Sequence, residues 1–518
     1  MLAFTFYDLL ALNLERRGDH PLVVERQRSA TYREVARAAE STAAALHDAG
    51  VRRGDRVVVH LHKSIEEVVA MFAIARLGAV FVNISHQWTV EQLDYVVRDS
   101  GAGVLFTDVR AARALMAHGL PDHVRRVIVN GAAPDDVRML TWDSLPRDRP
   151  APAPLGIDAD LAAILYTSGS TGAPKGVMLT HLNLLQGARS VARYLDNRPT
   201  DRLLSLLPFS FDYGLSQLTT MCTVGGTVVL QPVMMAAEIV KTLVEQQVTG
   251  FAAVPPAWIQ VVRFLAERPS ALPALRYVTN SGGKIPDDIL RQMPQVFAGA
   301  KIFLMYGLTE AFRSTYLPPE LFHEKMGSMG RAIPDVEVYL IDAGRGVCGP
   351  GQQGELVHRG SLISRGYWGK PEATAEKIRP CPELRHLIGD EPVVYSGDIV
   401  RLDDDGYLWF VGRNDAMIKA SGFRISPTEV EDSVFRCGLV AEVVAFGVAH
   451  ELNGQAVEIA VTAKADTALD VEALQAHCRR HMPTYMVPQR IHVWPGEFPR
   501  GGTGKIDRPQ VTKRFGGA

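Results

Sequence analysis

The stretch YTSGSTGAPKG, residues 166–176, directly follows an apolar segment at residues 162–166 that predicts a short strand. It combines several hydroxyl side chains and glycines with one lysine. Glycine backbone N–H groups can approach a ligand closely, and hydroxyl and ammonium groups suit phosphate oxygens. The stretch therefore predicts a loop that holds a polyphosphate. Its candidate phosphate ligands are Thr167, Ser168, Ser170, Thr171 and Lys175.

The position of the lysine separates this loop from that of the P-loop NTPases. Lys175 follows Pro174 and precedes Gly176, whereas a P-loop has glycine before its lysine and serine or threonine after it, at the start of a helix. A P-loop kinase or ATPase is therefore disfavoured. A mobile Gly/Ser linker is the plainer alternative, but the preceding strand and the Pro-Lys-Gly ending argue against it.

Strands alternate with helices on both sides of the loop, which predicts two similar α/β units with mostly parallel sheets. In the first unit, helices are expected over residues 32–48, 65–77 and 90–99, and strands over residues 56–61, 79–82 and 104–107. In the second unit, strands are expected over residues 162–166, 226–230, 276–279 and 301–305. From about residue 330, short alternating segments interrupted by glycine and proline predict a β-rich third unit.

A small C-terminal domain is predicted from a clear helix start. Ser426 and Glu429 have the spacing of a capping box, and Pro427 lies at the first helical position. The elements expected after it are strands at residues 443–447 and 456–463 and a helix from Asp470. The short polar segment near residues 413–415 suits a hinge, so we expect one domain over residues 1–413 and a second over residues 414–518.

Composition limits the classes of protein and partner. The 518 residues are too many for one hydrophobic core, and 47% hydrophobic with 22% charged residues is typical of globular proteins. The net charge of −2, without a long block of like charge, disfavours nucleic acid and anionic membranes as partners. The cysteines have no metal, redox or disulfide spacing, the amino terminus lacks signal-peptide features, and the longest apolar run is too short to cross a bilayer. We therefore expect a cytoplasmic protein.

Further motifs occur in order along the chain and, with YTSGSTGAPKG, carry a family resemblance. They are LPFSFDYG (207–214), NSGG (280–283), YGLTE (306–310), GELVHRG (354–360), YSGD (395–398), GRNDAMIKASGFRI (412–425) and GTGKIDR (502–508). Over almost its whole length the sequence resembles the adenylate-forming superfamily, which includes acyl-CoA synthetases, peptide-synthetase adenylation domains and luciferases. The resemblance implies an α/β fold with a large N-terminal domain of two α/β subdomains and a β-rich subdomain, and a small, mobile α+β C-terminal domain.

The resemblance also implies a two-step ligase that uses ATP and Mg²⁺. A carboxylate first attacks the α phosphorus of ATP to give acyl-AMP and pyrophosphate, and a phosphopantetheine thiol then takes the acyl group. The loop would hold the β and γ phosphates. Thr309 would contact the α phosphate, Glu310 would hold the magnesium, and Asp398, assisted by Arg413, would bind the ribose hydroxyls. The residues that would line the adenine are Ser281, Gly282, Gly283 and Tyr306.

Three residues in the C-terminal part would serve the change between the two steps. Lys505 would bridge the substrate carboxylate and the α phosphate, because two unit charges of like sign repel by roughly 4 kcal/mol at about 4 Å. Asp415 would be the hinge about which the small domain rotates, and Gly422 would flank the channel for the phosphopantetheine arm. Without the resemblance, the plainer interpretations are a solvated Lys505, a turn-capping Asp398 and an ordinary turn glycine at residue 422.

The acceptor is expected to be coenzyme A or a separate carrier protein, because the sequence ends at Ala518, shortly after Lys505. In LPFSFDYG, Phe211 and Asp212 fall at the expected mouth of the acyl pocket, where amino-acid-activating relatives keep an acidic group. A buried carboxylate requires a cation, which favours an amino-acid substrate. An ion pair of Asp212 with Arg313 is the structural alternative, and Arg313 would suit a polar or anionic substituent. The alternative function is then a conventional acyl-CoA ligase for a non-amino acid.

The resemblance is closest to freestanding acyl-CoA ligases and amino-acid adenylation enzymes. The stretches FSFDYGLSQLTT (209–220) and YGLTEAFRSTYLPPE (306–320) resemble enzymes of natural-product and exosortase-associated clusters, which favours a role in secondary metabolism. A catalytically silent nucleotide-binding protein is an alternative from a different class. The presence of Lys505, Glu310 and Asp398 argues against it.

Overall fold

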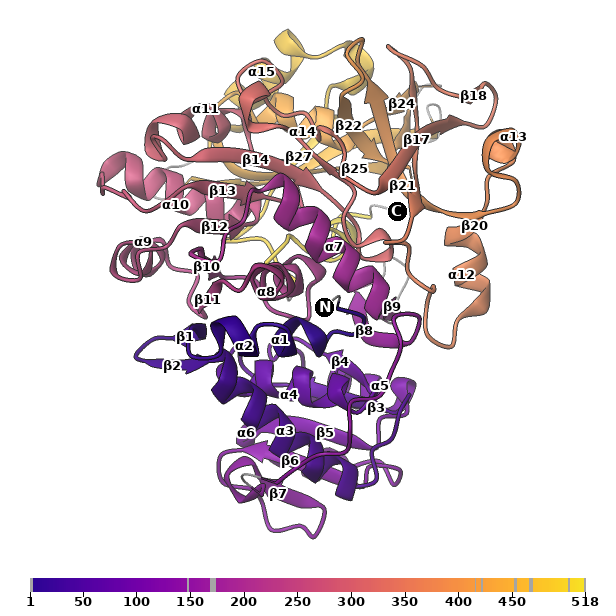
Figure 1. Cartoon of the computed structure of the whole chain (residues 1–518). Helices are drawn as coiled ribbons and strands as arrows, with labels where there is room; N and C mark the ends of the chain where they lie inside the picture. Colours follow the sequence, from indigo (N-terminus) through magenta and orange to yellow (C-terminus); the bar gives the residue numbers. More distant parts are fainter. Residues whose placement is uncertain are drawn as a thin grey trace.

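The computed structural model describes residues 3–146, 149–167, 174–414, 416–420, 423–450, 454–464, 469–501 and 504–516. These residues form four sheets with helices packed on them. In Figure 1 the first α/β unit lies at the bottom in indigo and purple, and the β-rich and C-terminal parts lie at the top in orange and yellow. None of the helices in the described ranges is long and apolar enough to cross a membrane.

The first α/β unit is built on a seven-stranded sheet in the order β7-β6-β5-β3-β4-β8-β9. Its strands pair in parallel except for β8 and β9, which are antiparallel. The strands are β3 (Arg56–His60), β4 (Val80–Asn83), β5 (Val104–Asp108), β6 (Arg126–Asn130), β7 (Met139–Thr141), β8 (Leu161–Thr167) and β9 (Lys175–Thr180). The helices are α3 (Tyr32–Asp48), α4 (Ile65–Arg76), α5 (Val90–Ser100), α6 (Val109–His118) and the short η1 (Trp142–Ser144). The elements predicted up to residue 107 are thus confirmed to within one residue at each end.

The second α/β unit is built on a nine-stranded sheet in the order β16-β15-β14-β13-β12-β10-β11-β1-β2. The central strands are parallel, and β2, β15 and β16 pair antiparallel at the edges. The strands are β1 (Pro21–Glu25), β2 (Arg28–Thr31), β10 (Arg202–Ser205), β11 (Thr227–Leu230), β12 (Gly250–Ala253), β13 (Tyr277–Asn280), β14 (Lys301–Tyr306), β15 (Thr315–Tyr316) and β16 (Arg331–Ala332). The helices are α1 (Asp8–Ala11), α2 (Leu14–Arg17), α7 (His181–Tyr194), α8 (Asp212–Val224), α9 (Ala236–Glu245), α10 (Pro255–Glu267), α11 (Asp287–Val296), η2 (Thr309–Ala311) and η3 (Pro319–Leu321).

Two strands belong to a different sheet from the one that the sequence order implies. Strand β8, expected to open the second unit, pairs with β4 of the seven-stranded sheet, where Ala163 is the partner of Phe81. Strand β1, near the amino terminus, pairs with β11 of the nine-stranded sheet. The expectation that the second sheet begins at residue 162 is therefore wrong. Alternation of strands and helices reports local conformation, whereas sheet membership depends on which strand edges meet in space.

Helices α3 and α4 show how local sequence sets these elements. Thr31 accepts a hydrogen bond from the N–H of Glu34, whose carboxylate accepts one from the N–H of Thr31, so α3 begins with a complete capping box. Helix α4 is buried on almost every side, from Glu67 to Arg76. A helix that is apolar all round belongs in a core. The long apolar run near residue 70 is therefore a core helix and the strand that follows it.

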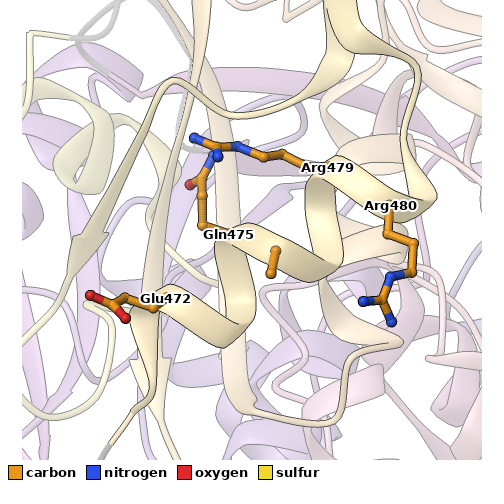
Figure 2. A pocket seen from close by; sticks show the side chains of 5 residues that line it. Glu472, Gln475, Arg479 and Arg480 are labelled. Carbon is orange, nitrogen blue, oxygen red and sulfur yellow. The ribbon is translucent and has the colours of Figure 1, made fainter.

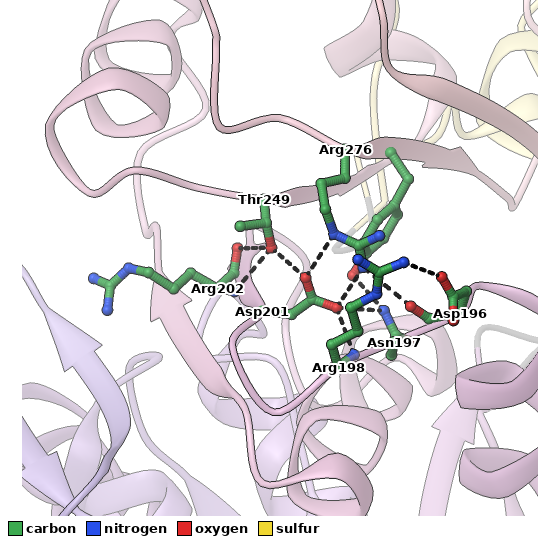
Figure 3. A network of polar contacts seen from close by, with 8 residues as sticks. Asp196, Asn197, Arg198, Asp201, Arg202, Thr249 and Arg276 are labelled. Atoms are coloured by element: carbon green, nitrogen blue, oxygen red, sulfur yellow. Dashed lines mark hydrogen bonds and ion pairs between the residues drawn. The ribbon is translucent and has the colours of Figure 1, made fainter.

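A buried ionic network joins the strands of the nine-stranded sheet at their amino ends (Figure 3). The carboxylate of Asp201 is almost fully buried and accepts from Arg276 Nη2 and from Thr249 Oγ1, each at 2.8 Å. It also accepts from the backbone N–H of Arg198 at 2.8 Å. Because these residues precede β10, β12 and β13, one carboxylate holds three strand ends together. Ligands of parallel sheets bind at the carboxyl ends of strands, so we assign this network a structural role.

The third sheet is antiparallel throughout, in the order β18-β17-β19-β21-β20 with β22 paired to β21. This confirms the predicted β-rich unit. Its strands are β17 (Val336–Asp342), β18 (Gly346–Val347), β19 (Gln353–Gly360), β20 (Ile378–Pro380), β21 (Pro392–Leu402) and β22 (Leu408–Arg413). The helices beside it are α12 (Pro371–Lys377), η4 (Pro382–Leu384) and α13 (Arg385–Ile388).

The C-terminal residues form a fourth sheet in the order β24-β23-β26-β25, with β27 paired to β26. Its strands are β23 (Ile418–Ala420), β24 (Phe423–Ile425), β25 (Val440–His450), β26 (Gly454–Ala463) and β27 (Arg490–Val493). The helices are α14 (Pro427–Phe435), α15 (Val471–His481), η5 (Thr484–Met486) and α16 (Arg508–Lys513). Ser426 caps α14 by accepting from the N–H of Glu429 at 3.3 Å, which confirms the predicted helix start.

Candidate functional site

The candidate phosphate loop joins two antiparallel strands. Strand β8 ends at Thr167 and β9 begins at Lys175, and these two residues are partners across the pair. Ser168, Ser170 and Thr171 lie outside the described residues. Because the loop leads into a strand, it lacks the helix that a P-loop opens. The P-loop alternative is thereby excluded.

Tyr367 connects the loop lysine with the candidate magnesium ligand. Its hydroxyl donates to Glu310 Oε1 at 2.5 Å, and Lys175 Nζ lies 5.4 Å from the centre of its ring. Burial and the charge of Glu310 raise the pKa of Tyr367, so its hydroxyl stays a donor. A cation and a carboxylate from distant motifs thus meet at one aromatic side chain. Sequence analysis missed Tyr367, whose only signal was its place in the Gly-rich stretch RGYWG.

Asp398 contacts two other predicted nucleotide ligands. Its side chain, on β21, is 7% exposed, and its Oδ1 accepts from Arg413 Nη1 at 2.9 Å. Its Oδ2 accepts from the hydroxyl of Tyr306, at the end of β14. The ring of Tyr306 lies 6.2 Å from that of His358, nearly parallel to it. The carboxylate bonds to side chains instead of capping the turn at Gly397, so the plainer interpretation of Asp398 does not hold.

Lys377 is a further cation beside these residues, and no motif pointed to it. It is the last residue of α12, and its Nζ donates to the backbone carbonyl of Ser396 at 2.7 Å. Burial lowers the pKa of Lys377, and the charges of Glu310 and Asp398 oppose that shift. The ammonium group is therefore close enough to the candidate magnesium ligand and the candidate ribose ligand to feel both charges.

Three of the four candidate adenine residues, Ser281, Gly282 and Gly283, follow directly after β13. Ser281 is buried, and Gly282 has a φ of +81°, which disfavours any side chain. A Cβ at Gly282 would lie 3.4 Å from Cε of Lys505, and one at Gly283 would lie 3.2 Å from Cγ of Pro255. The turn therefore requires glycine at residue 282 for its backbone conformation, and Lys505 lies within van der Waals range of it.

Lys505 reaches the N-terminal part from the C-terminal one. Its Nζ lies 5.6 Å from the centre of the Phe211 ring, and the residue as a whole is exposed to solvent. Desolvation of its ammonium group lowers the pKa of Lys505, and the charges of Asp212 and Asp398 oppose that shift. The structure thus brings the predicted lysine to the predicted acyl and nucleotide residues. A second contact between the two parts is the ion pair of Lys284 with Asp432 at 2.5 Å.

Asp212 has its cation within the protein. Its Oδ2 accepts from Arg313 Nη1 at 2.9 Å, and both side chains are almost fully buried. Burial raises the pKa of Asp212, while the charges of Arg313 and Lys505 oppose that shift. The guanidinium also lies 4.9 Å from the ring centre of Tyr213. The ion pair named as the structural alternative is therefore present, and Asp212 does not need a substrate ammonium.

A strained backbone delivers Arg313 to Asp212. Thr309, which is buried, starts the single turn of η2, and Phe312 directly after that turn has a φ of +53°. Such a backbone is costly for a residue with a side chain and persists only where packing enforces it. The ring of Phe312 occupies the space beside Gly187 on α7, where a Cβ would lie 2.4 Å from it. The packing of Phe312 on α7 thus holds both η2 and Arg313 in place.

Some predicted site features lie beyond what the structure describes. Asp415 and Gly422 are outside the described residues, so the hinge and the thiol channel stay predictions. No cluster of three or more His, Cys, Asp or Glu side chains suited to a metal occurs among the described residues, so Glu310 as a magnesium ligand also stays a prediction. A surface pocket on α15 is lined by Glu472, Gln475, Ala476, Arg479 and Arg480 (Figure 2), none of which was predicted for the site.

Two family models match the chain. Residues 10–368 match the AMP-binding enzyme family, and residues 429–505 match the AMP-binding enzyme C-terminal domain. The first match spans more than half of the chain, so the protein belongs to the AMP-binding enzyme family.

Characterised relatives include both CoA ligases and peptide synthetases. Feruloyl-CoA synthase of an Amycolatopsis species is 31% identical over 493 residues, which cover 94% of each chain. A long-chain-fatty-acid–CoA ligase of Salmonella typhimurium is 27% identical and covers 96% of this chain and 92% of that protein. One of the proteins that make up the linear gramicidin synthase of Brevibacillus parabrevis is 30% identical over 96% of this chain, but the chain spans only 6% of that relative.

Solved structures share the fold over the whole chain. An anthranilate–CoA ligase in complex with anthranoyl-AMP has a TM-score of 0.88 at 24% identity and covers 100% of this chain and 98% of its own. o-Succinylbenzoate–CoA synthetase of Bacillus subtilis with ATP and magnesium has a TM-score of 0.83 at 25% identity, and the match covers 97% of this chain and 98% of that one. These findings confirm the predicted superfamily, the fold with a large N-terminal and a small C-terminal domain, and an AMP-forming acid–thiol ligase that uses ATP and Mg²⁺.

Proposed function

We propose that the protein activates a carboxylic acid with ATP and Mg²⁺ as an acyl-AMP, releases pyrophosphate, and then transfers the acyl group to a thiol. The observation that carries the proposal is the position of Lys505, whose ammonium group lies 5.6 Å from the centre of the Phe211 ring and whose Cε lies beside Gly282. There it would meet an acid placed beside Phe211 and a nucleotide placed on residues 281–283. A cation between two anions stabilises the charge that develops as they react.

For the nucleotide, we propose that Thr167 and Lys175, with the loop between them, hold the β and γ phosphates. Asp398 and Arg413 would take the ribose hydroxyls, since a carboxylate accepts from both hydroxyls of a diol. Thr309 would contact the α phosphate, and Glu310 would bind the magnesium ion, which neutralises phosphate charge when bound. The contact of Tyr367 with Glu310 at 2.5 Å would orient that carboxylate.

For the second step, we propose a domain boundary between residues 413 and 414 and rotation about Asp415. Rotation would remove Lys505 from the cleft and bring Gly422 to it, so that one cleft serves both reactions. The acceptor is coenzyme A or the phosphopantetheine arm of a separate carrier protein. The CoA-ligase relatives, which match this chain over nearly their full length, support coenzyme A. Cysteines without disulfides support a cytoplasmic location.

For the acid, we propose a non-amino carboxylic acid. The argument for an amino acid was the need of Asp212 for a cation, and Arg313 meets that need at 2.9 Å. Relatives named for feruloyl and long-chain fatty acyl groups support this choice. Activation of an amino acid is the alternative, supported by the 30% identity to part of a peptide synthetase.

The test is a panel of amino acids and plain carboxylic acids, read by ATP-dependent pyrophosphate release and by trapping of the acyl group with hydroxylamine. We expect release with plain acids and a thioester when coenzyme A is added. If none of the acids in either set caused pyrophosphate release, ligase activity would be contradicted and a nucleotide-binding protein without catalysis would be favoured. A preference for amino acids would instead support the alternative function, activation of an amino acid.

A further inference from the structure

Arg313 is a buried cation with unused hydrogen-bonding capacity. Its side chain is 2% exposed, and its Nη1 donates to Asp212 Oδ2 at 2.9 Å and to the carbonyl of Phe312 at 3.0 Å. Its Nε and Nη2 are buried without a hydrogen-bond partner among the described residues. Buried donors are normally satisfied, and an unpaired one beside a charge is costly. The two free donors therefore point to a ligand that is supplied from outside the chain.

The side chains around Arg313 do not meet this need. The ring of Tyr213 lies 4.9 Å from the guanidinium carbon, but its hydroxyl donates to the carbonyl of Thr279. Tyr194 is half-buried nearby, and its hydroxyl donates to Met305 Sδ at 2.9 Å. The hydroxyls of Tyr213 and Tyr194 are thus engaged elsewhere, and no hydrogen bond joins Nε or Nη2 of Arg313 to any described residue, the buried hydroxyl of Ser314 included.

The two free nitrogens form the edge of arginine that holds carboxylates. Their N–H bonds run parallel, so that edge matches the two oxygens of a carboxylate. Elsewhere in this chain, Arg53 uses Nε and Nη2 to hold both oxygens of Asp160, at 2.9 and 2.8 Å. Arg359 even serves two carboxylates at once, with Nη1 on Glu337 and the Nε/Nη2 edge on Glu391. Arg313 has a carboxylate on Nη1, that of Asp212, but has none on its Nε/Nη2 edge.

The free edge lies next to the proposed acyl site. Arg313 is bound to Asp212, the first residue of α8, and Asp212 directly follows Phe211, whose ring faces Lys505. An acid whose reacting carboxylate meets Lys505 would therefore extend past Phe211 toward the guanidinium. This step rests on the proposed function.

We propose that the substrate is an acid with a second carboxylate, which accepts hydrogen bonds from Nε and Nη2 of Arg313. Asp212 is then a positioning residue: it holds Nη1 and fixes the orientation of the guanidinium without touching the substrate. Burial makes this recognition selective, because an acid without the second group leaves the donors unpaired. Arg313 is the residue that determines specificity.

The experiment compares short dicarboxylic acids, malonate to adipate, with monocarboxylic acids of equal chain length and with the monomethyl esters of the dicarboxylic acids. Pyrophosphate release gives kcat/KM for each acid. We expect the best dicarboxylic acid to exceed its matched monocarboxylic acid and its ester by on the order of 10- to 100-fold, as for a lost bond to a buried charge. In Arg313→Lys, which keeps the charge but loses the fork, this ratio should fall toward one.

Two further variants keep the outcome interpretable. Asp212→Asn/Arg313→Gln removes both charges together, so no buried charge is left unpaired if Arg313→Lys fails to fold. Arg359→Gln is the control, since Arg359 pairs with two carboxylates of the protein and lies outside the site, and it should keep the parent ratio. If the parent used dicarboxylic acids, monocarboxylic acids and esters with equal efficiency, the proposed role of Arg313 would be overturned and the proposed function would stand. The same conclusion would follow if the esters alone were as good as the dicarboxylic acids. Failure to release pyrophosphate with any acid, amino acids included, would overturn the proposed function instead.

Discussion

Replacing Lys505 with alanine should separate the two half-reactions. In the structure, Asp212 is paired with Arg313 and Asp398 with Arg413, each at 2.9 Å. Among the described residues no carboxylate forms an ion pair with Lys505, so its charge is available for the substrate. Lys505→Ala should therefore abolish most adenylation but leave transfer from supplied acyl-AMP to coenzyme A largely intact.

The size of the loss follows from the position of the ammonium group. Two unit charges about 4 Å apart interact by roughly 4 kcal/mol at an effective dielectric near 20. The residue is exposed overall although its ammonium group is partly desolvated, so water screens part of this interaction, and about 2 kcal/mol is a lower limit. At about 1.4 kcal/mol for each factor of ten, adenylation should fall by roughly 30- to 1000-fold.

The assay is ATP–pyrophosphate exchange for the first step and thioester formation from synthetic acyl-AMP for the second. Lys513→Ala is the matched control, because Lys513 is an exposed lysine of the same C-terminal part, on α16. Adenylation should also decline at alkaline pH before an ordinary lysine titrates, since desolvation lowers the pKa of Lys505 and only its protonated form carries charge. Comparable losses in both half-reactions, or less than about a fivefold loss in exchange, would refute the argument.

Other residues provide four further tests. Glu310→Gln should raise the Mg²⁺ concentration needed for half-maximal adenylation, since it removes the proposed ligand; unchanged magnesium dependence would show that other groups hold the ion. Asp415→Pro should retain adenylation and slow thioester formation, because proline fixes φ at the proposed hinge; normal thioester formation would place the hinge elsewhere. Lys377→Met should raise the KM for ATP at constant acid KM, because Lys377 Nζ holds the Ser396 carbonyl at 2.7 Å beside Asp398; an effect on the acid KM alone would contradict this. Gly187→Ala should destabilise the fold by about 1 to 3 kcal/mol in thermal or urea unfolding, because its Cβ would lie 2.4 Å from the Phe312 ring, whereas Gly349→Ala, with nothing within 4 Å, should not.

Several parts of the fold could be predicted from the sequence because the interactions that set them are local. Helix α3 runs from Tyr32 to Asp48 as predicted, since its capping box lies within four residues of its first turn. Helix α14 begins at Pro427 because Ser426 caps it. The motif order identified the superfamily, and with it the candidate residues Asp398, Arg413 and Tyr306, which lie together in the structure.

Other features depend on contacts between residues far apart in sequence, which the order of residues does not specify. Strand β8 joins the first sheet and β1 the second, because strand edges are chosen in space. Tyr367 and Lys377 belong to none of the family motifs. Only packing brings Tyr367 to Glu310 and Lys377 to Ser396.

The partner of Asp212 is the sharpest example. The sequence determined that a buried carboxylate would need a cation, because desolvation of an unpaired charge is too costly. It left open whether a substrate or Arg313 supplies that cation. The tertiary structure decided this through Phe312, whose positive φ and packing on Gly187 direct Arg313 to Asp212 and leave two of its nitrogens free.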